Sequence, residues 1–174
     1  MPPQERDNAT PRFFMSDFFV SHTLSDTDYC RLLVLPAIEA VVERNFNQYV
    51  FMNLDNFGNS SVTDGKNAAF FAKAYSKEVE RLLRDSRFML VVASLAATQS
   101  AWVRYEVGWW VSNRSVKEMM ILLREPCEPE RLHSGVGQCR WLTLIDLPET
   151  DAVGKLRTVL ERMLSPGQLK GDHP

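Results

Sequence analysis

The sequence feature that most constrains the fold is an unbroken apolar run at residues 88–93, Phe-Met-Leu-Val-Val-Ala. A strand with one face in water alternates apolar and polar residues, whereas a parallel strand covered by helices on both faces reads as a continuous apolar run. Even extended to residue 97, the stretch is far shorter than the roughly 20 residues of a membrane span. We therefore expect a central strand that is buried on both faces.

Segments with strand and helix patterns alternate along the rest of the chain. Strands are expected at residues 13–20, 48–54, 88–93, 119–123 and 141–145, and helices at about 68–84, 101–112 and 153–164. Apolar residues at helical spacing also run from Leu32 to Val42, where Pro36 predicts a late start or a kink. This alternation predicts an α/β fold, a flavodoxin-like three-layer sandwich with a five-stranded parallel sheet (order 2-1-3-4-5) and helices on both faces.

The 174 residues fit one domain with short tails. We expect a flexible leader at residues 1–11, the domain at 12–165 and a flexible tail at 166–174. The hydrophobic share of 45% is enough for a core without disulfides or metal. Three widely spaced cysteines indicate neither a disulfide framework nor a zinc site, so no metal site is expected.

Charge and targeting patterns narrow the choice of partners and compartment. The chain has 20 basic and 22 acidic residues and a net charge of −2, so it lacks the basic surface that binds nucleic acid. No apolar run is long enough for a membrane span, and no signal-peptide pattern is visible. Together with free cysteines, these features favour a cytoplasmic protein with neither nucleic-acid nor membrane partners.

The expected strand order also locates a candidate site. The chain reverses direction between strands 1 and 3, and α/β proteins bind ligands outside the carboxyl ends of the strands at such a switch point. The loops that meet there are residues 21–28 and 94–100. Ser21 and His22 open the first loop, and Ser100 at the end of the second is a good N-cap for the next helix.

Glu106 has an unusual place on the helix expected at residues 101–112. The apolar face of its helical wheel is formed by Trp102, Val103, Val107, Trp109 and Trp110. Glu106 falls within this face, leans toward the helix N-terminus and the 94–100 loop, and has Trp102 one turn away. A buried carboxylate is costly unless something pairs with it. Two interpretations are open: a carboxylate at a ligand site, or a structural one that caps a buried polar group or pairs with an arginine such as Arg87.

Three sequence blocks together resemble TIR (Toll/interleukin-1 receptor) domains. Residues 17–23, Asp-Phe-Phe-Val-Ser-His-Thr, followed by Asp26, resemble the first-strand motif of the family. Residues 85–94 resemble its third strand and the approach to it, and Ser100-x-Trp102-x-x-x-Glu106 is similar to the signature at its third helix. The blocks follow the family's order and spacing, and the resemblance covers about residues 13–164. Two departures are Val103, where a cysteine often stands, and a 55–65 loop without the proline of many receptor-type members.

The function that this resemblance implies depends on the branch of the family. Some members are scaffolds that signal by TIR–TIR oligomerisation, while others, including many bacterial ones, hydrolyse or cyclise NAD⁺ with the signature glutamate. The match at Glu106 implies the NAD-cleaving, bacterial-type branch: an NAD⁺ glycohydrolase or ADP-ribosyl cyclase, acting as an immune or stress effector, with NAD⁺ as substrate and no cofactor. It also implies self-association through TIR–TIR contacts and a separate sensor or effector protein as partner. A non-enzymatic scaffold is the alternative, and a nucleoside deoxyribosyltransferase-like enzyme, with a related fold and a glutamate, is a third reading.

The residue types suit cleavage of the nicotinamide–ribose bond. This reaction develops positive charge on the ribose, which a nearby carboxylate stabilises as in glycoside hydrolysis. Nicotinamide leaves as a neutral base, so one carboxylate without a general acid suffices. We expect Glu106 to be catalytic and Trp102, Ser21, His22 and Ser100 to bind substrate, with Trp102 as an aromatic wall. For His22, a loop histidine bonded to the backbone is an equal alternative.

Overall fold

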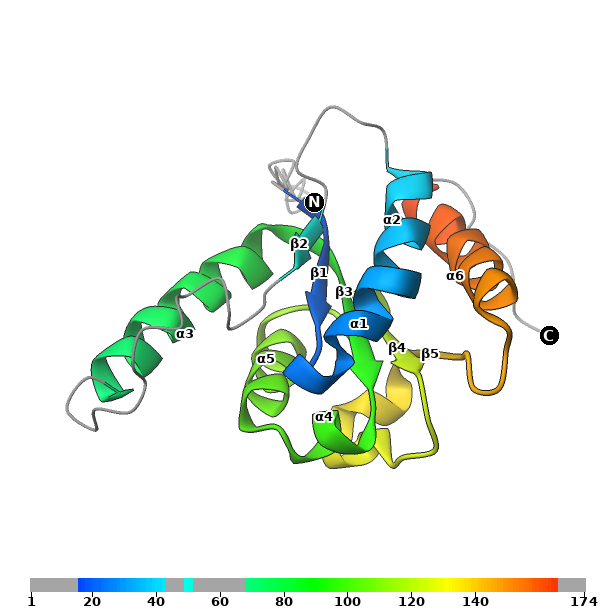
Figure 1. Ribbon diagram of the computed structural model, residues 1–174. Helices are drawn as coiled ribbons and strands as arrows, with labels where there is room; N and C mark the ends of the chain where they lie inside the picture. Colours follow the sequence, from blue (N-terminus) through cyan, green and yellow to red (C-terminus); the bar gives the residue numbers. More distant parts are fainter. Residues whose placement is uncertain (1–15, 43–48, 52–67, 166–174) are drawn as a thin grey trace, which may run out of the picture.

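The computed structural model of the protein describes residues 16–42, 49–51 and 68–165 (Figure 1). Side chains are described in these ranges except at residues 49–51 and 68–75. The expected leader, the expected tail and the 55–65 loop lie outside the described residues, as do the first three residues of the strand expected at 13–20.

Five parallel strands form one sheet in the order β2-β1-β3-β4-β5 (Figure 1). They are β1 (Ser16–Ser21), β2 (Tyr49–Phe51), β3 (Ser86–Ala93), β4 (Met119–Leu123) and β5 (Arg140–Thr143). The flavodoxin-like class and the order 2-1-3-4-5 are thereby confirmed. Ser21 pairs with Val91, and Val91 with Ile121, so the carboxyl ends of β1 and β3 are adjacent, as the switch-point argument requires.

Helices cover both faces of the sheet (Figure 1). The helical segments are α1 (Thr27–Tyr29), a π-helical turn (Cys30–Val34), α2 (Leu35–Val41), α3 (Ala68–Asp85), α4 (Leu95–Gln99), α5 (Ala101–Asn113), α6 (Glu149–Leu164) and 3₁₀ turns at Leu24–Asp26, Val116–Glu118, Pro129–Arg131 and Ser134–Gln138. On β3, Leu90 and Val92 join the core beneath α2 and α6, whereas Met89 and Val91 join the core beneath α3 and α5. The apolar run therefore supplies two cores from alternate residues.

The helix after β1 accommodates Pro36 in an unexpected way. It begins at Thr27, so a late start is wrong, and Leu35 donates its backbone N–H to the carbonyl of Cys30 in a π-helical turn. Proline has no N–H to donate and its ring crowds the carbonyl four residues earlier. A wider turn just before Pro36 places the proline in the first turn of α2, where its missing N–H is tolerated.

Two further elements differ from expectation. The segment 94–100, expected as a loop, contains α4, because Ser94 caps it by accepting a hydrogen bond from the Ala97 backbone N–H at 3.0 Å. The last helix begins at Glu149 rather than at residue 153, with Glu149 and Asp151 in its first turn, where acidic groups favour the helix dipole. Within the described residues, no helix combines the length and apolarity that a membrane span needs.

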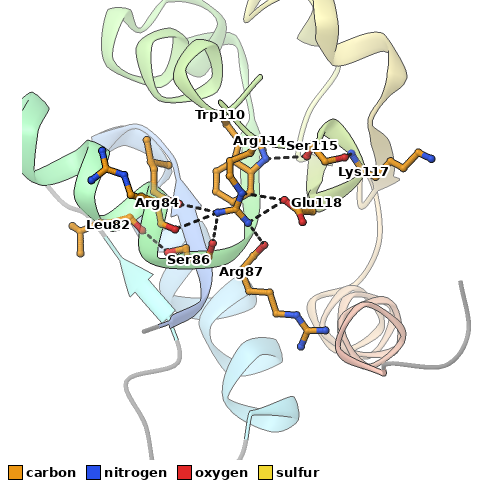
Figure 2. Close-up of polar contacts among 10 residues, drawn as sticks. Leu82, Arg84, Ser86, Arg87, Trp110, Arg114, Ser115, Lys117 and Glu118 are labelled. Carbon is orange, nitrogen blue, oxygen red and sulfur yellow. Dashed lines mark hydrogen bonds and ion pairs between the residues drawn. The ribbon is translucent and has the colours of Figure 1, made fainter. Parts of the chain in front are cut away.

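Arg114 anchors the C-terminal end of α5 to the start of β3 (Figure 2). Its guanidinium donates to the carbonyl oxygens of Ser86 at 2.7 Å and Arg87 at 3.1 Å, and lies 4.5 Å from the Trp110 ring centroid. It also pairs with Glu118, and its side chain is only 3% exposed. Because these contacts join two elements, they fix α5 against the strand beside β1, and α5 carries Glu106.

Candidate active site

The structure brings Ser21 and Glu106 together at the predicted switch point. Ser21 is the last residue of β1, and its hydroxyl donates a hydrogen bond of 2.5 Å to Oε2 of Glu106. Both residues are buried, with 1% and 4% of their surface exposed. Residues 85 positions apart in the chain therefore form one polar pair in an apolar setting at the carboxyl edge of the sheet.

The local sequence of α5 explains how Glu106 reaches this place. Ser100 caps the helix, since its hydroxyl accepts a hydrogen bond of 3.3 Å from the backbone N–H of Val103. From this start, the buried face of the helix consists of Val103, Glu106, Val107 and Trp110. The predicted cap at Ser100 and the predicted place of Glu106 within the apolar face are both confirmed. Whether Ser100 also contacts a substrate stays a prediction.

Burial dominates the electrostatics of Glu106. It raises the pKa of this carboxyl from its ordinary 4.5 to about 7, while the hydrogen bond from Ser21 acts in the opposite direction. Among the described residues, no cation forms an ion pair with it. The expected alternative partner, Arg87, instead places its guanidinium 4.8 Å from the ring centroid of Phe88. A structural ion pair with Arg87 is therefore wrong, and the hydroxyl of Ser21 is the polar group that meets the carboxylate.

His22 follows directly after this pair and is half-buried. Its Nδ1 lies 3.4 Å from the carbonyl oxygen of Val20, a long contact at most. Burial lowers the pKa of His22 below its ordinary 6.5, against the opposing effects of the Val20 carbonyl and the charge of Asp26. The ring is therefore neutral at pH 7. This matches a loop histidine held near the backbone, and contact with a substrate stays a prediction.

Trp102 lies one turn before Glu106 and is partly buried. It packs against the core beneath α3 and α5 and meets Tyr105 edge to face, with ring centroids 6.1 Å apart. Tyr105 is held in turn by Glu80 of α3, which accepts a hydrogen bond of 2.5 Å from its hydroxyl. A packing role for Trp102 is thus in place, whereas its contact with a substrate stays a prediction.

Asp26 is the centre of a polar cluster that sequence reasoning missed. It is fully buried, and its Oδ2 accepts hydrogen bonds from Thr23 at 2.6 Å and Ser94 at 2.8 Å. Its Oδ1 forms an ion pair with Arg124, the residue after β4. The cluster joins the loops that follow β1, β3 and β4. Asp26 stood in the first TIR-like block without a role, and the available signal for Arg124 was a charge directly after a buried strand.

The arrangement offers acid–base and electrostatic chemistry. In the described part of the chain, no group of three or more His, Cys, Asp or Glu side chains could hold a metal ion. Cys30, Cys127 and Cys139 are free thiols. The chemistry that the described side chains themselves offer comes from Glu106 with its Ser21 partner and from the neighbouring Asp26 cluster.

Comparison by sequence finds no relative, since no protein-family model and no curated protein matches the chain significantly. Comparison by structure finds proteins with a similar fold. The TIR domain of the Toll-related receptor TRR-2 from Hydra magnipapillata aligns with a TM-score of 0.57 and 11% identity, over 86% of this chain and 99% of that one.

This chain has the fold of a TIR domain.

A metazoan TIR-STING receptor from C. gigas, solved in complex with 2′,3′-cGAMP, shows the same fold with a TM-score of 0.55 and 19% identity. The alignment covers 84% of this chain and 40% of that chain, so this chain matches less than half of the receptor's length. Within the TIR fold seen here, the three TIR-like sequence blocks form β1 with its loop, β3 with its approach, and the first half of α5. These segments meet at Ser21 and Glu106.

Proposed function

We propose that this protein cleaves NAD⁺ at the nicotinamide–ribose bond, as a glycohydrolase or ADP-ribosyl cyclase, with Glu106 as the catalytic carboxylate. The observation that carries the proposal is a buried carboxylate whose partner is a hydroxyl rather than a cation, at the switch point of a TIR fold. A carboxylate with a raised pKa in such a position is typical of a functional site. The structural neighbours support a TIR-type signalling or NADase domain in general.

The proposed reaction begins with heterolysis of the bond between C1′ of the ribose and the nicotinamide nitrogen. The bonding electrons leave with nicotinamide, which becomes neutral, and positive charge develops on the ribose. Glu106 stabilises this oxocarbenium-like state through its negative charge. Water then adds to C1′ and loses a proton, giving ADP-ribose, or a nitrogen of the adenine takes the place of water and gives a cyclic product.

Ser21 supports this chemistry by stabilising the ionised form of the Glu106 carboxylate and by fixing its orientation. With a pKa near 7, Glu106 is present in both protonation states at neutral pH, and the reaction needs the charged one. The hydroxyl of Ser21 donates to the charged form and stabilises it. The cationic nicotinamide of the substrate favours the same form. His22, Trp102 and Ser100 are proposed to line the bound ribose and nicotinamide.

Access to Glu106 requires a rearrangement, because only 4% of the residue is exposed. We propose that assembly with other copies of this chain, or with a separate sensor or effector protein, favours the open form. An enzyme that is inactive alone and active on assembly suits an immune or stress effector, since it leaves NAD⁺ untouched until a trigger arrives.

Product analysis tests the proposal. The purified protein at high concentration is incubated with NAD⁺, and the products are separated by liquid chromatography and identified by mass spectrometry. We expect nicotinamide with ADP-ribose or a cyclic form, in amounts that Glu106→Gln abolishes and Glu161→Gln, on the exposed side of α6, leaves unchanged. Absence of nicotinamide at every concentration would favour an interaction module, and exchange of deoxynucleosides would favour a deoxyribosyltransferase.

A further inference from the structure

Arg124 stands at the same edge of the sheet as Glu106, two strands away. Its backbone N–H donates to the carbonyl of Ala93 at 3.1 Å, which extends the β3–β4 pairing by one residue. The register from Ser21 through Val91 to Ile121 puts Arg124 about 10 Å across the sheet and about 10 Å further along the strand direction. Arg124 therefore lies beyond the carboxyl ends of the strands, on the ligand side.

The guanidinium of Arg124 is held in place but only partly used. Its Nη1 pairs with Oδ1 of Asp26, and its Cζ lies 5.0 Å from the ring centroid of Tyr29. In the part of the chain that the structure describes, Nε and Nη2 of Arg124 have no hydrogen-bond partner. The side chain is 33% exposed, whereas that of Asp26 is 1% exposed. An oriented arginine with free donors in a fork is the arrangement that binds phosphate oxygens.

Asp26, the buried partner of Arg124, is stabilised by other groups besides the positive charge of the guanidinium. Asp26 also accepts hydrogen bonds from Thr23 and Ser94, and these satisfy its second oxygen, Oδ2. A bound anion can therefore share the guanidinium without leaving the carboxylate of Asp26 unpaired. Asp26 thus acts as a support that keeps the fork of Arg124 in one orientation.

A hollow of about 340 Å³ opens between α4 and the segment 126–131 that follows β4 and Arg124. Leu95 and Thr98 of α4 line one side, and Pro126, Cys127 and the ion-paired Glu128 and Arg131 line the other. Its volume falls within the roughly 300–1,000 Å³ that small-molecule sites have. The carboxyl edge of the sheet thus carries the Glu106 carboxylate at the end of β1 and the Arg124 guanidinium after β4, with the partly apolar hollow beside α4.

We infer that Arg124 binds the diphosphate of a dinucleotide substrate whose nicotinamide ribose lies at Glu106. This inference rests on the proposed function for the position of the ribose. The diphosphate of NAD⁺ adjoins its nicotinamide ribose, so a carboxylate and an arginine at one edge of the sheet can meet these two groups of a single substrate. Other described cations near this edge are less suited, because Arg131 is already paired with Glu128 and is two-thirds exposed.

Calorimetric titration with two ligands tests this assignment. NAD⁺ carries the diphosphate and the adenosine, and nicotinamide riboside lacks both, so the ratio of their Kd values reports the contacts beyond the nicotinamide ribose, and the change of that ratio in an Arg124 variant reports the share of Arg124 in them. The titrations use the Glu106→Gln background, in which NAD⁺ is not consumed. Two variants are compared. Arg124→Lys keeps the positive charge but loses the paired N–H donors of the guanidinium. The double variant Asp26→Asn, Arg124→Gln removes both charges of the ion pair and so leaves no buried unpaired charge. Arg104→Gln, an exposed arginine on α5, is the matched control.

We expect the double variant to raise the Kd for NAD⁺ by about tenfold or more, as the loss of a charge-assisted contact to phosphate does. The Kd for nicotinamide riboside should stay the same, Arg124→Lys should fall between, and Arg104→Gln should bind both ligands like the parent. Equal weakening of both ligands, or no binding of NAD⁺ by the parent, would overturn the inference. A different outcome would overturn the proposed function alone. In that outcome NAD⁺ binding depends on Arg124, but the protein with Glu106 intact releases no nicotinamide.

Discussion

Glu106 holds its proton in the folded protein to a higher pH than in the unfolded chain. Burial raises its pKa from 4.5 to about 7, so between these values the folded state binds more protons than the unfolded state. Stability from this group is therefore present below pH 4.5 and is lost as the pH rises through 7. Above that pH, the buried charge lowers the free energy of unfolding by on the order of 3 kcal/mol. A charge kept at such a cost is easier to explain by function than by folding.

Ser21→Ala tests the role of the hydroxyl in setting this pKa. The hydrogen bond from Ser21 stabilises the charged form of Glu106, so its removal should raise the pKa further. The acid limb of the pH–rate profile for nicotinamide release should then move to higher pH, with activity at pH 7 reduced and partly recovered in alkaline buffer. Ser16→Ala at the other end of β1, where the hydroxyl bonds to the Phe18 carbonyl, is the control. An unmoved acid limb would argue against this role.

Trp102→Ala separates an aromatic wall from a packing residue. If the indole lies against the bound nicotinamide ribose, the KM for NAD⁺ should rise about tenfold or more, with a modest loss of stability from its contact with Tyr105. Steady-state kinetics and thermal unfolding of the same protein give both values. A loss of stability with an unchanged KM would leave only the packing role.

At the scale of elements, α5 carries Glu106 of the candidate site and is held at both ends by hydrogen bonds. Ser100 caps its start, and Arg114 ties its end to the carbonyl oxygens at the beginning of β3 (Figure 2). Glu106 lies two turns before Arg114, so the position of the carboxylate relative to Ser21 depends on this fastening. These contacts hold α5, and with it Glu106, against β1 and β3.

Arg114→Gln should destabilise the protein more than the loss of a surface ion pair does. Its guanidinium is buried and donates to several carbonyl oxygens, which would be left unsatisfied, and we expect a loss of about 2–4 kcal/mol in urea unfolding. Arg81→Gln removes an exposed pair with Glu78 on α3 and should leave the midpoint unchanged. Equal midpoints for the two variants would contradict the anchoring role.

Most elements could be predicted because their patterns are local. The apolar run at 88–93 and the period of α5 depend only on neighbours in sequence, and β4 was predicted with its observed ends. Helix α4 was missed because a five-residue helix has too few turns to show a period. The π-helical turn before Pro36 was missed because a proline excludes regular α-helical hydrogen bonding but does not determine which other backbone geometry forms instead.

At the scale of the molecule, the strand order decides which side chains meet. The switch point between β1 and β3 was sufficient to predict that the end of β1 and the first half of α5 lie close together. The partner of each charge was not predictable. Asp26 and Arg124 are 98 residues apart, and only the finished packing shows that Arg124 pairs with Asp26 while Arg87 does not pair with Glu106.

Self-association is the prediction that belongs to the whole molecule. Because Glu106 is closed off in the structure, contacts between copies of the TIR fold are expected to favour the open form and to stabilise it by mass action. Specific activity should therefore rise with protein concentration, in parallel with the oligomeric fraction measured by light scattering. A monomer with full specific activity at high dilution would contradict this prediction.

Glu106→Gln tests the central claim most directly when activity and stability are measured on the same protein. Glutamine keeps the size of the side chain and removes its charge, so nicotinamide release should fall by about two or more orders of magnitude, as preorganised charge of this kind contributes roughly 3–4 kcal/mol. The free energy of unfolding above pH 7 should stay the same or rise, because the substitution removes an unpaired buried charge. A folded variant that releases nicotinamide at the parent rate would contradict the account, as would a variant whose activity falls only in step with a loss of stability.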